Sequence, residues 1–190
     1  MRKKIGMMTA LAVLVMSLAG CGTTGPSSAT NTSQSSGASG ATVSDGTIKV
    51  EQLTMDLPEG FQSSTTPGLI LSNDYPDDLS NIYVYCEDKY DDFDDMLRGR
   101  SDEYVAHMQE AYEEQYSERP EIEVICYEQS PIVGRNAYRI ELSYTLQGIP
   151  YYQLEYVIDA DKTYYVAFSQ VGDHDYKSTF EGAVSTIAIK

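Results

Sequence analysis

The chain has 190 residues with 13 basic and 29 acidic side chains, a formal net charge of −16, and it contains 16 tyrosines but no tryptophan. A surface with this charge repels nucleic acid and anionic lipid, so a nucleic-acid-binding role is excluded. The charge favours solvated cations, basic proteins or cationic peptides as partners, or it serves solubility alone.

Residues 1–20 have the pattern of a bacterial lipoprotein signal peptide. Three basic residues occupy positions 2–4, and the apolar stretch over 7–18 is too short to span ~30 Å of hydrocarbon. The stretch ends in Leu-Ala-Gly-Cys, which resembles a lipobox and implies that Cys21 is lipidated. A plain secretory peptide is the alternative. We therefore expect attachment to the cell membrane through Cys21, on the extracytoplasmic face at the bacterial cell surface.

The segment over 21–47, which begins with the lipidated Cys21, is predicted to be a tether. Residues 22–47 are nearly all Ser, Thr, Gly and Ala, with Asp45 as the one charge. Such a composition buries too little apolar surface to offset the entropy of ordering, which predicts a disordered segment spanning ~25–30 Å. The remaining residues, 48–190, are enough for one domain and too few for a two-lobed binding protein.

The first part of this domain is predicted to be built from strands. Alternating apolar residues predict a strand over 48–57, and the proline and glycine within 56–61 end it. Short strands are expected over 69–71 and 81–86, with the turn-forming residues of 73–78 between them.

The stretch KYDDFDDMLRG, over 89–99, predicts a short helix. Its apolar residues Phe93, Met96 and Leu97 are spaced at i, i+3 and i+4. Gly99 is placed to end the helix. The four aspartates then lie at its N-terminus and on its solvated side: Asp91, Asp92, Asp94 and Asp95.

A second, longer helix is expected to begin at Ser101 or Asp102 and to end before Pro120. Bulky residues recur at every fourth position, while glutamates occupy the opposite side. The residues predicted to face inward are Tyr104, Met108, Ala111, Tyr112 and Tyr116.

The rest of the chain predicts four strands, a helix and a terminal strand. The strands are expected over 122–126, 138–146, 151–158 and 163–170, and a helix follows Gly172 and Asp173. Ile187 and Ile189 indicate a short terminal strand. The whole order predicts an α+β domain, with a central antiparallel sheet of about six to seven strands flanked by two main helices.

Four segments resemble the PsbP-like superfamily over 48–190: DLPEGF, IVGRNAYRIEL, YYQLEYVIDADKTYYVAFSQ and DYKSTFEGAVSTIAI. The resemblance implies a central antiparallel sheet flanked by helices, and usually a binding or scaffolding role without catalysis. No family site motif occurs at matching positions, so the resemblance assigns no functional residue in this chain.

The sequence offers little for catalysis. The two histidines, His107 and His174, stand alone, and no metalloprotease, serine-hydrolase or phosphate-loop motif occurs. We assign no catalytic residue, metal ligand or cofactor. For Cys86 and Cys126, which share one predicted side of the sheet, a disulfide and two buried free thiols both stay open. The tyrosines are expected to pack beneath the helices with wet hydroxyls, or else to form a partner-binding patch.

The strongest local feature is acidic. Residues 74–123 hold 17 acidic and four basic side chains, a net charge of −13. The leading interpretation is a non-catalytic domain whose acidic surface binds a protein or cationic partner in the cell envelope. The alternative is a calcium-dependent binding module with a site shared between 73–78 and 87–92, because calcium needs six to eight converging oxygens. An envelope enzyme is the third interpretation.

Overall fold

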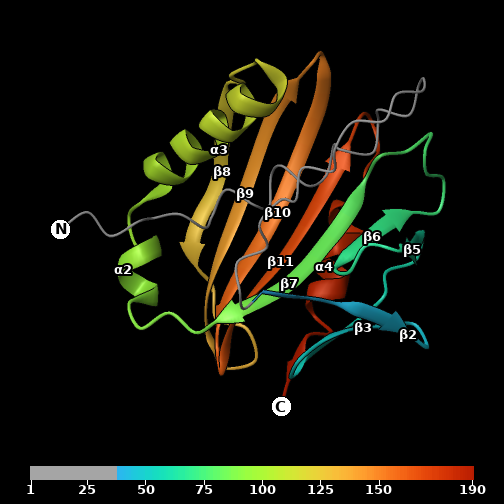
Figure 1. The fold of residues 1–190 in the computed structure, drawn as a ribbon, viewed down its shortest axis with the longest axis vertical. Helices are drawn as coiled ribbons and strands as arrows, with labels where there is room; N and C mark the ends of the chain where they lie inside the picture. The colour runs from blue at the N-terminus through green and yellow to red at the C-terminus, as the bar shows by residue number, and fades with distance from the viewer. Residues whose placement is uncertain (1–37) are drawn as a thin grey trace, which may run out of the picture.

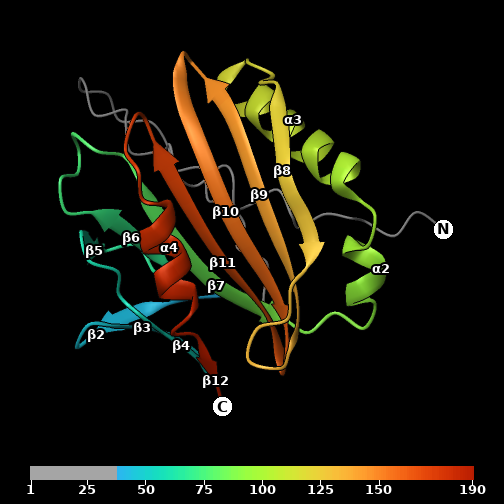
Figure 2. The same cartoon turned by 180° about the vertical axis from the view of Figure 1, so that it is seen from behind.

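A computed structural model describes residues 38–190. Their strands form two antiparallel sheets, and helices cover both faces of the larger one (Figures 1 and 2). This confirms the predicted α+β class with a central antiparallel sheet. In spatial order the large sheet contains Phe61–Ser63 (β5), Leu69–Ser72 (β6), Asn81–Asp88 (β7), Lys162–Val171 (β11), Ile149–Asp159 (β10), Asn136–Leu146 (β9) and Ile122–Gln129 (β8), and Ser39–Gly40 (β1) also pairs with β7.

The second, smaller sheet was not predicted. The strand expected over 48–57 is a hairpin, because the chain reverses at Glu51, whose φ of 47° lies in the left-handed region. Residues distant in sequence complete the sheet, since Ile189 pairs with Leu53. Its strands in spatial order are Ala188–Ile189 (β12), Leu53–Asp56 (β4), Thr47–Val50 (β3) and Thr42–Ser44 (β2).

The ordered domain begins earlier than the sequence predicted. Residues 38–47 were assigned to the tether, yet they contain β1 and β2. The polar composition misled the prediction, because backbone pairing with β7 and β3 supplies the order that few apolar side chains could supply here. The signal peptide, Cys21 and the rest of the tether lie outside the described residues.

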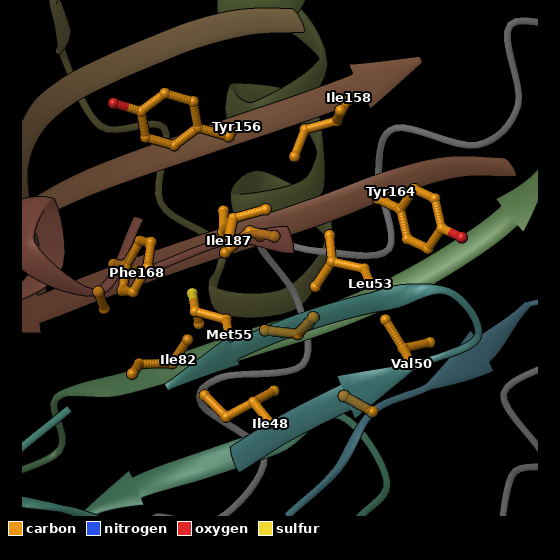
Figure 3. Close-up of a cluster of buried hydrophobic side chains, with 14 of the residues drawn as sticks. Ile48, Val50, Leu53, Met55, Ile82, Tyr156, Ile158, Tyr164, Phe168 and Ile187 are labelled. Carbon is orange, nitrogen blue, oxygen red and sulfur yellow. The ribbon is translucent and has the colours of Figure 1, made fainter. Parts of the chain in front are cut away.

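One face of the large sheet is covered by the small sheet and by helix α4 (Lys177–Val184), as Figure 2 shows. We call the buried side chains between them the α4-side layer. They come from both sheets and from the C-terminal segment (Figure 3). Central members are Ile48, Leu53, Met55, Ile82, Leu154, Ile158, Phe168, Phe180 and Ile187.

The other face carries helices α2 (Phe93–Leu97) and α3 (Ser101–Tyr116), close to the predicted bounds. Gly99 follows α2 with a φ of 69°, as its predicted role at a helix end requires. Eleven of the 16 tyrosines pack on this face, and we call them the tyrosine layer. They are Tyr83, Tyr85, Tyr90, Tyr104, Tyr112, Tyr116, Tyr127, Tyr138, Tyr144, Tyr151 and Tyr165.

The register of β9 and β10 decides which side chains meet α3. Gln147 and Gly148 form a two-residue turn with positive φ at both positions, the conformation that matches the twist of paired strands. The turn aligns Tyr151 with Tyr144, so that alternate residues of β10 point at α3. Glu155 lies on this same face, opposite Ile140.

Candidate functional site

Helices α2 and α3 and strand β8 lie next to one another on one flank of the molecule, on the left in Figure 1. Their solvent-facing side chains are mostly carboxylates. We call this surface the acidic flank. Its exposed carboxylates are Asp91, Asp92, Asp95, Asp102, Glu103, Glu110, Glu113, Glu114, Glu121, Glu123 and Glu128.

The helical period places these charges outward. In α3 the residues Tyr104, Met108 and Tyr112 are buried, as their spacing predicted. Glu110 and Glu114 each lie two residues from a buried position and are exposed on the opposite side. Four aspartates were predicted to face solvent on α2, and three do so, whereas Asp94 is half-buried because it accepts a hydrogen bond from the Asn136 amide at 2.7 Å.

Few basic side chains offset this charge. Arg100 pairs with Glu103 at 2.7 Å and Arg119 with Glu113 at 3.1 Å. A third arginine, Arg98, pairs with Asp94, which is outside the exposed set. Within residues 38–190, eight carboxylates of the acidic flank have no lysine, arginine or histidine at ion-pair distance: Asp91, Asp92, Asp95, Asp102, Glu114, Glu121, Glu123 and Glu128.

A buried hydrogen-bond network fixes α3 on the sheet. The Tyr104 hydroxyl donates to Glu155 Oε2 at 2.5 Å, and Gln153 Nε2 lies 3.5 Å from the same oxygen. Tyr144 donates to Gln153 Oε1 at 3.4 Å and shares a 2.6 Å hydrogen bond with Tyr112. Both ends of the network are therefore residues of α3, so that α3 has one favoured position over β9 and β10.

Glu155 has an unusual environment for a carboxyl group. Only 2 % of the residue is exposed, and its hydrogen-bond partners are neutral. Burial raises the pKa of Glu155 from 4.5 to about 7, although the hydrogen bonds from Tyr104 and Gln153 act in the opposite direction. The carboxyl group therefore titrates near neutral pH.

Glu141, which faces the other side of the sheet, shows the opposite behaviour. Arg139 and Lys177 each lie 2.5 Å from one of its oxygens. Burial acts to raise the pKa of Glu141, but the hydrogen bond from Lys177 and the nearby cations lower it below its ordinary value. Glu141 thus differs from Glu155 in having two cationic neighbours, and the sequence patterns had indicated neither residue. The two-residue period could have predicted that Glu155 is buried, since Gln153 and Glu155 lie on the same side of the strand as Tyr151 and Val157.

Eleven tyrosines pack on the sheet face that carries α2 and α3, but several hydroxyls are not wet. Those of Tyr104, Tyr112 and Tyr144 are bonded within the network described above. At the end of β7 the Tyr90 hydroxyl donates to the buried Glu87 at 2.5 Å. The expectation of wet hydroxyls is wrong for these residues, because buried carboxyl and amide groups take the place of water.

The structure separates the two loops proposed to share a calcium ion. Residues 73–78 precede β7 and residues 87–92 follow most of it, so the eight-residue strand holds them roughly 25 Å apart. Over residues 38–190 no three His, Cys, Asp or Glu side chains are grouped closely enough to hold a metal ion. The predicted shared site is therefore wrong in its geometry.

The two cysteines also lie apart. Cys86 is on β7 and Cys126 is on β8, and three strands lie between them, which amounts to ~19 Å at the usual strand spacing. A disulfide needs Cα atoms within about 7 Å, so both are free thiols, Cys86 buried and Cys126 half-buried. Burial raises the pKa of both thiols, which leaves neither as a reactive thiolate.

The two histidines belong to segments on opposite faces of the large sheet. His107 lies on α3 with Glu110 at 3.8 Å. His174 precedes α4, stacks on Tyr176 and lies 3.4 Å from Asp78. Tyr176 donates to the same buried aspartate at 2.9 Å, so these contacts fasten the start of α4 to the loop before β7.

Comparison with known proteins supports the fold. No protein-family model matches the sequence, and no curated protein matches it significantly. A solved structure of cyanobacterial PsbP (CyanoP) from Synechocystis is similar, with a TM-score of 0.52 and 14 % identity, over 87 % of this chain and all of that chain. The fold is therefore PsbP-like.

Two further solved structures are more distant. PA94 from Pseudomonas aeruginosa, a putative regulator of unknown function, has a TM-score of 0.40 and 13 % identity over 80 % of this chain and 98 % of its own. LpqN, which is involved in cell envelope biogenesis of Mycobacterium tuberculosis, has a TM-score of 0.44 and 12 % identity over 73 % of this chain and 83 % of its own. In the described part of the chain, no helix has the length and apolar character needed to cross a membrane.

Proposed function

We propose that this chain is a lipoprotein of the bacterial cell envelope, lipidated at Cys21, and that its PsbP-like domain binds a cationic envelope or secreted component through the acidic flank. The observation that carries the proposal is the set of eight exposed carboxylates without an ion-pair partner, which lie on α2, α3 and β8 and on the residues that lead into α2 and β8. Such a surface steers cationic partners towards it and repels acidic ones.

The distribution of polar groups supports binding in preference to catalysis. Glu155 has a perturbed pKa but is sealed beneath α3, where a substrate has no access to it. On the acidic flank, Cys126 is half-buried and burial raises the pKa of its thiol, which makes it a poor nucleophile, while His107 is paired with the carboxylate of Glu110 at 3.8 Å. The network around Glu155 then serves to hold α3, which presents much of the acidic flank.

The proposal is tested with full-length protein in a neutral detergent and decalysine as the cationic probe. The variant Asp91→Asn/Asp92→Asn/Asp95→Asn removes three unpaired charges from α2 and from the loop before it. Each charge pair at an exposed site contributes only a fraction of a kcal/mol, so we expect binding roughly threefold to tenfold weaker by calorimetry.

A matched control removes three exposed charges from the small-sheet side: Asp45→Asn/Glu51→Gln/Glu59→Gln. This variant has the same net charge as the first, but it should bind decalysine as the wild type does. Equal weakening in both variants would mean that decalysine binding depends on net charge alone, and this would contradict the proposal that the acidic flank is the binding site. Crosslinking in cells with the same pair of variants then tests capture of the natural partner.

A further inference from the structure

Strand β8 offers a long unpaired edge. Within residues 38–190 it is the last strand of the large sheet and pairs only with β9 over its eight residues. The other terminal strands in the described part of the chain are short, with three residues in β5, three in β2 and two in β12. An edge of this length is a template for another strand unless the protein protects it.

The pairing pattern shows which backbone groups point away from the sheet. The Ser130 N–H donates to Ala137 O at 2.8 Å, so Ser130 is directed at β9. Backbone direction alternates along a strand, so Glu128 also faces β9, whereas the N–H and C=O groups of Tyr127 and Gln129 point outward. These groups lie on the regular part of β8, after the bulge between Val124 and Cys126.

The exposed side chains of this strand include both apolar and acidic residues. Val124 is 37 % exposed and Ile125 is 49 % exposed, which makes β8 the source of two of the four large exposed hydrophobic residues of the described chain. Glu123 and Glu128 flank them, and both are exposed. A strand laid along β8 would meet apolar side chains and carboxylates together.

Charge decides between the possible occupants. In a second copy paired antiparallel with Tyr127 opposite Gln129, Glu128 would lie directly against its own counterpart, and like charges in directly opposed positions destabilise a sheet. The bulge further protects the edge from regular self-pairing. We propose that the outer edge of β8 binds an extended segment of the partner, with basic and apolar residues in alternation, as an added strand of the large sheet. This inference rests on the proposed function of the acidic flank.

The test uses an eight-residue peptide that alternates lysine and valine, added to full-length protein in a neutral detergent. Three control peptides accompany it: one with the same residues in blocks, one with glutamate for lysine, and one methylated on every second backbone nitrogen. The amides of Tyr127 and Gln129 should become protected from hydrogen exchange. Because methylation removes backbone donors but no charge, affinity should fall roughly tenfold.

A matched pair of variants tests the backbone contact from the protein side. Gln129→Pro removes the outward N–H, and a proline on an edge strand leaves the pairing with β9 intact. Gln129→Ala loses the same side-chain hydrogen bond to Asn136 but keeps the N–H. We expect the proline variant to bind the alternating peptide roughly tenfold more weakly than the alanine variant, with unchanged amide spectra elsewhere.

The outcomes separate the two proposals. If decalysine binds the acidic flank but the alternating, block and methylated peptides bind alike, the strand-edge inference is overturned while the proposed function stands. Protection at α3 without protection at β8 would overturn it as well. If no cationic peptide binds, both proposals fail. Self-association of the protein through β8, detected by sedimentation, would overturn the choice of a cationic partner.

Discussion

On the α4 side of the large sheet the buried side chains are mainly Ile, Leu, Val and Phe, whereas on the α3 side tyrosines surround the carboxyl group of Glu155. Both layers exclude water. Hydrogen bonds between buried tyrosine, glutamine and glutamate side chains cross the second layer, whereas α4 makes polar contacts at its start, from Tyr176 to Asp78 and from Lys177 to Glu141. The comparison indicates a division of roles, because apolar burial supplies stability without direction and a bonded polar network selects one position for α3.

The largest expected effect comes from the α4-side layer. Phe180 is fully buried and packs against Phe61 and Phe168, at ring-centroid distances of 5.7 and 4.7 Å. Phe180→Ala should lower the free energy of unfolding by about 3–5 kcal/mol, since it loses apolar burial and leaves a cavity. Urea unfolding measures this. A loss below about 1 kcal/mol would show that α4 contributes little to the core.

The next effect belongs to Glu155 and depends on pH. The folded protein holds this proton up to about pH 7, whereas an unfolded chain releases it near its ordinary pKa of 4.5. Folded protein therefore binds more protons between these values, and its free energy of unfolding falls as pH rises through them. The fall should be roughly 3 kcal/mol between pH 4 and pH 8.

The variant Glu155→Gln keeps the shape and removes the titration. The difference between the wild-type and variant unfolding curves isolates this group from the rest of the acidic surface. Burial also raises the pKa of Glu87, so both proteins are best compared in a Glu87→Gln background. Parallel pH profiles for the two would contradict the assignment of the buried proton to Glu155.

A smaller effect is expected from one hydroxyl of the tyrosine layer. Tyr112→Phe removes the 2.6 Å hydrogen bond to Tyr144 and keeps the ring packing. The loss should be about 1 kcal/mol, because Tyr144 retains its contact with Gln153. Amide hydrogen exchange in α3 should increase more than exchange in α4. Equal changes in the two helices would argue against a separate role for the tyrosine layer.

The smallest effect is expected on the surface. Asp91→Asn/Asp92→Asn/Asp95→Asn should change the free energy of unfolding by less than about 0.5 kcal/mol per site, since all three side chains are exposed and unpaired. Thermal unfolding at moderate salt checks this. A loss comparable with that of Phe180→Ala would show that these aspartates support the fold rather than serve as a free surface.

Local patterns predicted the helices well. The spacing of Phe93, Met96 and Leu97 placed α2, and the four-residue recurrence of bulky side chains placed α3, because each helix buries one stripe. The meander from β8 to β11 followed from alternation. The structure of these elements is determined by residues that are close together in the sequence.

Other features depend on contacts between distant segments. Nothing near Leu53 indicates that Ile189 pairs with it, and Ser39 and Gly40 have no apolar signal for their pairing with β7. The bulge in β8 turns Cys126 to the face opposite Val124, which alternation alone cannot foresee. The acidic surface could be predicted from composition, whereas the network that holds α3 could be recognised only once the register of β10 was known.

The entry of the chain into the domain has a mechanical consequence. β1 is two residues long, and close packing leaves no room for a side chain at Gly40, where a Cβ would lie 2.7 Å from the carbonyl of Pro67. A lipid anchor at Cys21 would transmit any pull to this short strand first. Few hydrogen bonds hold β1, so under tension it would detach while both side-chain layers stay packed. The chain between the anchor and the domain would then lengthen before the domain unfolds.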